Sequence, residues 1–287
     1  MPEGHTLHRL ARDQTARFAG APVTVTSPQG RFAEQAALVD GRVLDAVTAH
    51  GKHLFATFGD RVVHVHLGLF GKYGGGTGNP PPPRGALRMR WVGSDAWTDL
   101  RGPTACEVLT PSEVEVVVAR LGPDPLARRP DGTAAYVRIG RSRAPIAALL
   151  MDQAVLSGVG NVYRAELLFR HQVPPFLPGR DLGPLRWTAM WADLVTLMRA
   201  GLRSGRIVTT RPEDRDRSGG RVRQQDAHYV YRRTDLPCRV CGTPVAMQLL
   251  AARKLYWCPV CQSSRPAVPA RRRRVDVARS ASSSSGG

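Results

Sequence analysis

Four cysteines near the carboxyl end of the chain are spaced as two close pairs. Cys238 and Cys241 form one pair and Cys258 and Cys261 form the other, with two residues between the members of each. Each pair can present two thiolates from one turn, and four thiolates complete the tetrahedral shell of zinc. Two disulfides or an iron–sulfur cluster are the alternatives. We expect one structural Zn²⁺, because four protein ligands leave no open position, and we expect the fifth cysteine, Cys106, in the core.

The balance of charge points to a polyanionic partner. Lys and Arg number 41 against 23 acidic residues, a net charge of +18 with a pI of about 11.0. Nucleic acid is the commonest partner of so basic a chain. A charge that only prevents self-association is the alternative, but the basic residues are clustered, as at Arg271–Arg274.

Length and hydropathy restrict the class of protein. The chain has 287 residues, of which 42% are hydrophobic, so it can bury the cores of two modest domains. We find no run near the roughly 18 apolar residues of a membrane span, and the first ten residues lack the apolar core of a secretory signal. We therefore expect a monomer without membrane contact, in the cytoplasm and associated with the nucleoid through DNA.

The first part of the chain predicts a helix followed by short strands. Leu7, Leu10, Ala11 and Phe18 recur at helical spacing, and Gly20 can end that helix. Turn residues then separate β-type runs, which predicts an antiparallel sandwich or barrel. The predicted strands are 23–25, 54–58, 62–67 and 87–92, and the Gly- and Pro-rich segment 74–85 is predicted to be an exposed loop.

The second part of the chain predicts helices. Ser112 and Glu115 have the spacing of a capping box, so we expect a helix to begin there. Further helices are predicted at 147–156, 161–171 and 184–203, followed by a basic, irregular loop over 206–235. The final stretch, rich in Arg and Ser, has the composition of a disordered tail.

Six motifs in order resemble one family, the bifunctional formamidopyrimidine-DNA glycosylases and endonuclease VIII enzymes. The chain opens with Met-Pro-Glu-Gly, and the resemblance continues through the segments 51–54, 66–69, 121–126, 157–163 and 253–262. The resemblance implies an α+β fold: an N-terminal β-sandwich with a leading helix, a helix–two-turn–helix domain, and a four-cysteine β-hairpin zinc finger. We place the domains at 1–115, 116–235 (with a lesion loop) and 236–262, and the tail at 263–287.

The same resemblance implies the reaction of a DNA glycosylase with an associated strand-cleaving lyase. Removal of Met1 would leave Pro2 with a free secondary amine, which can attack a sugar C1′ and form an iminium. Glu3 is expected to move protons as bonds break. Lys52 is expected to contact the phosphate beside the lesion and to support proton transfer. For each residue, an ordinary surface position is the alternative.

Further residues are implied to hold DNA. Arg253 is expected to grip the phosphates that flank the extruded nucleotide, with Lys254 beside it on the zinc hairpin. Asn161 can donate to a phosphate at a helix start, although a simple N-cap is the alternative. Glu166 matches a family position near the active site, and a buried helix salt bridge is its alternative.

A leucine is the candidate for filling the gap left by an extruded nucleotide. Leu69, at the tip of the 66–71 loop, can unstack a base step, although it could instead be a core leucine. Family members often add an arginine and an aromatic residue on a second loop; segment 99–103 offers Arg101 and no aromatic residue. Thr6 also stands where many members have glutamate. These departures favour the endonuclease VIII branch, which acts on oxidised pyrimidines.

Two other functions remain open from the sequence. One is an oxidised-purine glycosylase of the same fold, acting on formamidopyrimidine or 8-oxoguanine. The other is a non-catalytic zinc protein that binds DNA. The sequence predicts damaged DNA, double- or single-stranded, as the partner in all of these cases.

Overall fold

Helix α1 (Gly4–Phe18) opens the chain described by the computed structural model, which comprises residues 2–215 and 220–263. Its buried residues Leu7, Ala11 and Phe18 lie on one side at helical spacing and pack into the first core. The helix ends before Gly20, whose φ of +82° turns the chain toward the sheets. The predicted leading helix is therefore confirmed.

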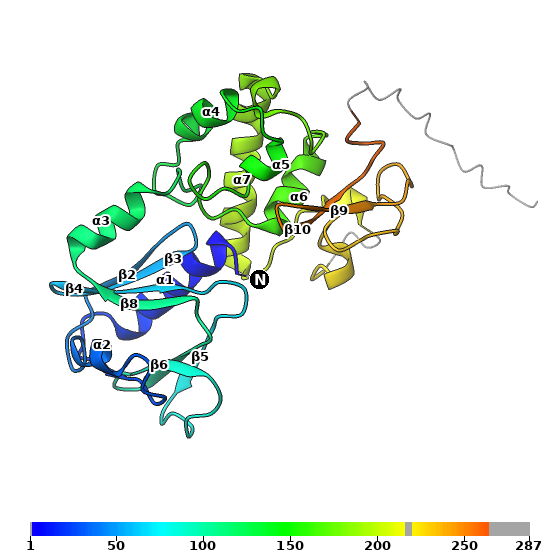
Figure 1. The fold of residues 1–287 in the computed structure, drawn as a ribbon. Helices are drawn as coiled ribbons and strands as arrows, with labels where there is room; N and C mark the ends of the chain where they lie inside the picture. The colour runs from blue at the N-terminus through cyan, green and yellow to red at the C-terminus, as the bar shows by residue number, and fades with distance from the viewer. Residues whose placement is uncertain (1, 216–219, 264–287) are drawn as a thin grey trace, which may run out of the picture.

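Two four-stranded antiparallel sheets follow and pack face to face (Figure 1). One has the order β1 (Thr24–Thr26), β6 (Leu87–Val92), β7 (Ala96–Arg101), β5 (Lys72–Thr77). The other has the order β2 (Ala46–His50), β3 (His53–Phe58), β4 (Arg61–His66), β8 (Ala105–Leu109). Their inner faces share one core with α1 and with the short helix α2 (Ala33–Ala37). This is the β-sandwich that the sequence predicts.

The segment 74–85 differs in part from the predicted loop. Gly74 to Thr77 belong to β5 and pair with β7 at the edge of the sheet. Trp97 of β7 explains the glycines, because a Cβ on Gly75 would lie 2.6 Å from its backbone oxygen and a Cβ on Gly76 3.1 Å from its ring. The glycines thus allow close packing within a strand, and only the part after Thr77 forms the loop.

In the described residues between the sandwich and the zinc hairpin, the α-helices are α3 (Pro111–Ala119), α4 (Thr133–Gly140), α5 (Ile146–Leu149), α6 (Asn161–Arg170) and α7 (Pro184–Ser204). The predicted capping box is wrong by two residues, since Thr110 accepts from the Glu113 N–H and Glu113 bonds back to Thr110 N. The helix predicted over 147–156 ends at Leu149. Beyond it, Asp152 and Gln153 bond to nearby backbone groups, which favours turns over helix.

The chain ends in the hairpin β9 (Ala246–Leu250) and β10 (Arg253–Trp257), which lies beside α6 (Figure 1). Single 3₁₀ turns, η1 (Gly179–Asp181), η2 (Pro212–Asp214) and η3 (Gln224–Asp226), occur in the connections. Within the described residues, every helix is too short or too polar to span a bilayer. The predicted tail, apart from Ser263, lies outside the described residues.

Candidate active site and zinc centre

The carboxylate of Glu3 occupies the amino-terminal end of α6. One oxygen accepts from Gly160 N at 2.8 Å, and the other accepts from Val162 N at 2.8 Å. Tyr163 N donates a longer bond of 3.4 Å. These are the amides that a helix leaves unpaired at its start, and the helix dipole adds favourable charge there. The second helix of the predicted helix–two-turn–helix region thus holds the acidic residue that follows Pro2.

The buried Glu3 and the half-buried Lys52 interact electrostatically. Glu3 is fully buried, and burial raises its pKa although Lys52 and the three amides oppose the rise. Burial also lowers the pKa of Lys52, against the attraction of Glu3 and together with repulsion from Arg253. The Lys52 ammonium donates to Val159 O at 2.6 Å. The opposite shifts bring the two pKa values closer together, as is typical of side chains that transfer protons in active sites.

Three glycines make the close approach of these segments possible. A Cβ on Gly4 would lie 2.9 Å from Cα of Gly158, and a Cβ on Gly51 would lie 3.0 Å from Gly158 N. Gly4 N also donates to Gly158 O at 2.8 Å. The glycines belong to three separate sequence motifs. Their contact brings together the half-buried Pro2, the start of α6 and the turn between β2 and β3 that carries Lys52, here called the lysine hairpin.

Asn161 joins α6 to the zinc hairpin. Its amide donates to Lys254 O at 2.9 Å, and Arg164 donates to the same oxygen at 3.2 Å and to the Asn161 side chain. Arg164, which the sequence analysis missed, is fully buried, and burial lowers its pKa to about 10. Arg253 lies near enough to repel both Arg164 and Lys52. The predicted residues Asn161, Lys254 and Arg253 therefore gather beside Glu3.

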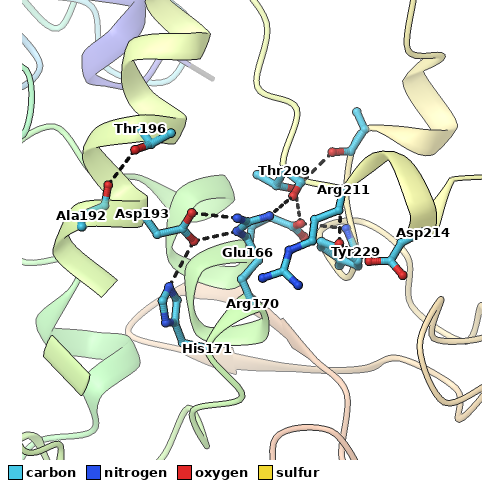
Figure 2. A network of polar contacts seen from close by, with 11 residues as sticks. Glu166, Arg170, His171, Ala192, Asp193, Thr196, Thr209, Arg211, Asp214 and Tyr229 are labelled. Atoms are coloured by element: carbon cyan, nitrogen blue, oxygen red, sulfur yellow. Dashed lines mark hydrogen bonds and ion pairs between the residues drawn. The ribbon is translucent and has the colours of Figure 1, made fainter. Parts of the chain in front are cut away.

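Glu166 is the one predicted DNA-binding residue that the structure places out of reach. It is fully buried, and its two oxygens accept from the backbone N–H groups of Tyr229, Val230 and Tyr231. The Thr209 hydroxyl also donates to it (Figure 2). The prediction of a DNA contact is wrong, because every oxygen is already used inside the protein. The expected alternative, a helix salt bridge, is also not what the structure shows; the carboxylate instead holds Thr209 and the backbone of residues 229–231 against α6.

The loop between β4 and β5 presents two exposed apolar side chains. Leu69 is 42% exposed and Phe70 is 86% exposed. The sequence analysis did not single out Phe70, which directly follows Leu69 on the same loop, and segment 99–103 contains no aromatic residue. Arg101 lies at the base of this loop, opposite Lys72 in the sheet, and bonds to the buried Asp99 at 2.8 Å.

The four predicted cysteines form the metal centre. Their sulfurs all lie within 4.8 Å of one another. The Cys238–Cys261 and Cys241–Cys258 sulfur pairs are 3.9 and 3.4 Å apart. Zinc–sulfur bonds of about 2.3 Å in a tetrahedron require sulfurs about 3.8 Å apart, so the site fits one structural zinc. Cys106 lies apart from it, against the sandwich core as predicted.

Known proteins share this arrangement over nearly the whole chain. Endonuclease 8 1 of Mycobacterium bovis is 54% identical over 268 residues, which cover 92% of this chain and 100% of that protein. The DNA-(apurinic or apyrimidinic site) lyase Nei2 of Mycolicibacterium smegmatis is 35% identical over 271 residues, with 92% and 100% covered. The chain belongs to the formamidopyrimidine-DNA glycosylase and endonuclease VIII family.

The domain matches and a solved structure agree with this membership. The formamidopyrimidine-DNA glycosylase N-terminal domain matches residues 1–106, its H2TH domain matches 121–212, and the zinc finger found in FPG and IleRS matches 235–263. A complex of Lactococcus lactis Fpg with DNA containing an abasic site has the same fold, with a TM-score of 0.76 at 20% identity over 91% of this chain and 99% of that one. As a family member, the protein is a DNA-binding glycosylase of DNA repair with a zinc finger.

Proposed function

We propose that the protein removes oxidised bases, pyrimidines in preference to purines, and then cleaves the strand through a covalent intermediate on Pro2. The observation that carries the proposal is that the buried Glu3, which follows Pro2 directly, and the half-buried Lys52 meet at the start of α6. Similarity to an endonuclease 8 supports the preference for oxidised pyrimidines, and similarity to an abasic-site lyase supports strand cleavage.

The chemistry follows from the amine of Pro2 once Met1 has been removed. The nitrogen attacks C1′ as the bond from C1′ to the base breaks; the nitrogen then gives up its proton, and the departing base takes one. The nitrogen lone pair then expels the ring oxygen O4′, which takes a proton, and an iminium forms. Glu3 is the group placed to supply and recover these protons, because it directly follows Pro2 and burial raises its pKa toward the range of a general acid.

Strand cleavage requires only proton transfers after that step. The iminium acidifies the proton on C2′; its removal drives loss of the 3′ phosphate, and a further elimination can release the 5′ phosphate. Lys52 and Arg253 are proposed to hold the phosphates beside the reacting sugar. Asn161 and Lys254 are proposed to extend this contact, with DNA lying against the zinc hairpin and the amino-terminal end of α6, and one monomer acting on one site.

Borohydride trapping tests the proposal, because only an iminium is reduced to a stable adduct. The protein with Pro2 exposed is expected to be trapped on abasic DNA, and Pro2→Gly is expected to form less adduct while it binds DNA with similar affinity. Binding without trapping would leave a non-catalytic DNA-binding protein. Full cleavage activity in a preparation that mass spectrometry shows to retain Met1 would also contradict the role of Pro2.

A panel of lesions tests the substrate preference. Thymine glycol or dihydrouracil is expected to be excised faster than 8-oxoguanine or formamidopyrimidine, in duplex and in single strands. The opposite ranking would place the protein with the oxidised-purine enzymes.

A further inference from the structure

Asp124 joins two segments that carry reactive groups. It is 3% exposed and lies in the 121–126 segment between α3 and α4. Its Oδ2 accepts from His8 Nε2 at 2.7 Å and from Gly51 N at 2.7 Å, and its Oδ1 accepts from Leu126 N at 2.8 Å. A carboxylate only accepts, so His8 must carry its proton on Nε2. One oxygen atom therefore ties α1 to the lysine hairpin.

The two tied segments are the ones that hold Pro2 and Lys52. His8 lies on the helix that begins directly after Glu3, and Gly51 immediately precedes Lys52. A second bond, from His50 Nε2 to Gly122 O at 3.2 Å, fastens the same hairpin to the same segment. Asp124 therefore influences the positions of Pro2 and Lys52 indirectly, through α1 and through the backbone of the lysine hairpin.

The hairpin has little freedom to compensate if this tie is lost. Gly51 has a φ of +58°, and a Cβ there would collide with Ser157. On its other side, the Lys52 side chain ends on Val159 O. A shift of the hairpin would therefore separate Lys52 from Glu3, and displacements of about 1 Å in a reacting site can cost a hundredfold in rate.

We propose that Asp124 is a positioning residue that sets Lys52 against Glu3 and Pro2 for reaction. This inference rests on the proposed function, because it concerns the geometry of the same covalent step. Burial raises the pKa of Asp124, but the hydrogen bonds from His8, Gly51 and Leu126 outweigh burial and hold the pKa below its ordinary value, which favours the ionised, accepting carboxylate.

Asp124→Asn is the central variant. Asparagine keeps the size of the side chain, but its one oxygen cannot serve Leu126 N, Gly51 N and His8 together. In either orientation the asparagine NH₂ faces a donor, either Leu126 N or the pair Gly51 N and His8 Nε2, and the negative charge that held them is lost. We expect the single-turnover rate of strand cleavage at an abasic site to fall by about tenfold to a hundredfold. The Kd for DNA with an uncleavable abasic analogue should change by less than about threefold, since no DNA-binding side chain is removed.

The chain offers a chemically matched control at the other end of β3. Asp45 Oδ2 accepts from Gly59 N at 2.7 Å, and Gly59 also has a positive φ, of +64°. Asp45→Asn also changes a carboxylate that accepts from a glycine N–H, but this bond lies at the end of β3 that is distant from Lys52. The cleavage rate should therefore stay within about twofold. Asp193→Asn, which disturbs a half-buried ion pair with Arg170, controls for a general loss of stability.

Variants of His8 test the hydrogen bond between His8 and Asp124, which connects Asp124 to α1. His8→Leu removes the donor to Asp124 and is expected to slow cleavage. His8→Gln can still donate from its amide and is expected to recover most of the rate, at a similar melting temperature.

The outcomes separate the two proposals. If the unmodified protein gives no borohydride adduct, the covalent mechanism fails. If it is trapped but Asp124→Asn cleaves as fast as Asp45→Asn, the positioning role fails alone. The role also fails if Asp124→Asn and Asp193→Asn lose rate in the same proportion as they lose stability, or if His8→Gln is no better than His8→Leu.

Discussion

The side-chain amide of Asn161 donates to the backbone oxygen of Lys254 at 2.9 Å, which makes the first turn of α6 and the zinc hairpin one unit. Asn161→Ala breaks that bond and removes a donor from the proposed phosphate site. We expect DNA affinity to fall about tenfold, equivalent to about 1.4 kcal/mol, in an anisotropy titration. Asn79→Ala, in an exposed loop, is the matched control and should leave affinity unchanged. Equal losses in the two variants would contradict the link.

Zinc should matter through the placement of Arg253. Cys258→Ser is expected to weaken DNA binding and to reduce the slope of log affinity against log salt by about one, the share of one phosphate contact. Cys106→Ser changes the same residue type outside the metal centre and should leave the slope unchanged. If the salt dependence of zinc-depleted Cys258→Ser is unaltered, the zinc hairpin does not position Arg253 for its phosphate contact.

Leu69 and Phe70 are expected to act together as a wedge in duplex DNA. Replacing both with alanine removes the apolar surface that would fill the gap after extrusion, where unstacking costs a few kcal/mol. Excision from duplex should fall by about tenfold or more, with a smaller loss on single strands. Leu185, at 87% exposure, is a matched control, because Leu185→Ala removes a similar surface on α7. Equal losses on duplex and single strands would argue against a wedge.

Short-range patterns in the sequence predicted the elements and the metal centre well. The cysteine spacing identified the zinc ligands, and the periodicity around Leu7 and Phe18 identified α1, because each depends on neighbours along the chain. The Gly74–Thr77 strand was missed because its glycines are explained only by Trp97 on a partner strand.

The site residues depended more on contacts between distant segments. The sequence motifs and the resemblance identified Pro2, Glu3 and Lys52 as one candidate site, but they could not show which partners each side chain would have. Glu166 was expected to face DNA and instead holds the amides of residues 229–231. Asp124 stood inside a recognised motif without a role, since its two partners lie 116 and 73 residues away.

The low pKa of Asp124 also predicts how stability depends on pH. Its pKa is lower in the folded protein than the ordinary 3.8, so its contribution is fully present above about pH 5 and is lost as pH falls through the folded pKa. Asp124→Asn should therefore lower the free energy of unfolding at pH 6 and show a shallower loss between pH 5 and pH 3. Denaturant unfolding at a series of pH values measures this. Parallel pH profiles for the two proteins would mean that the carboxylate has an ordinary pKa.

The turn of the zinc hairpin carries backbone strain that a substitution can remove. Ala251 and Ala252 connect β9 to β10 with φ values of +48° and +58°, and the flanking Leu250 and Arg253 pair directly. Left-handed backbone costs an L-residue about 1–2 kcal/mol, whereas Asn-Gly suits a two-residue hairpin turn.

The double variant Ala251→Asn, Ala252→Gly should therefore raise the free energy of unfolding by about 1 kcal/mol, measured with zinc saturating so that metal binding does not differ. Ala37→Gly in the exposed part of α2 is the control and should lower it by about 0.5–1 kcal/mol, because there the backbone is helical and glycine only adds freedom to the unfolded chain. Arg253 follows the turn, so DNA affinity should be retained if the turn keeps its shape. A less stable double variant would show that the alanine side chains make contacts worth more than the strain they impose.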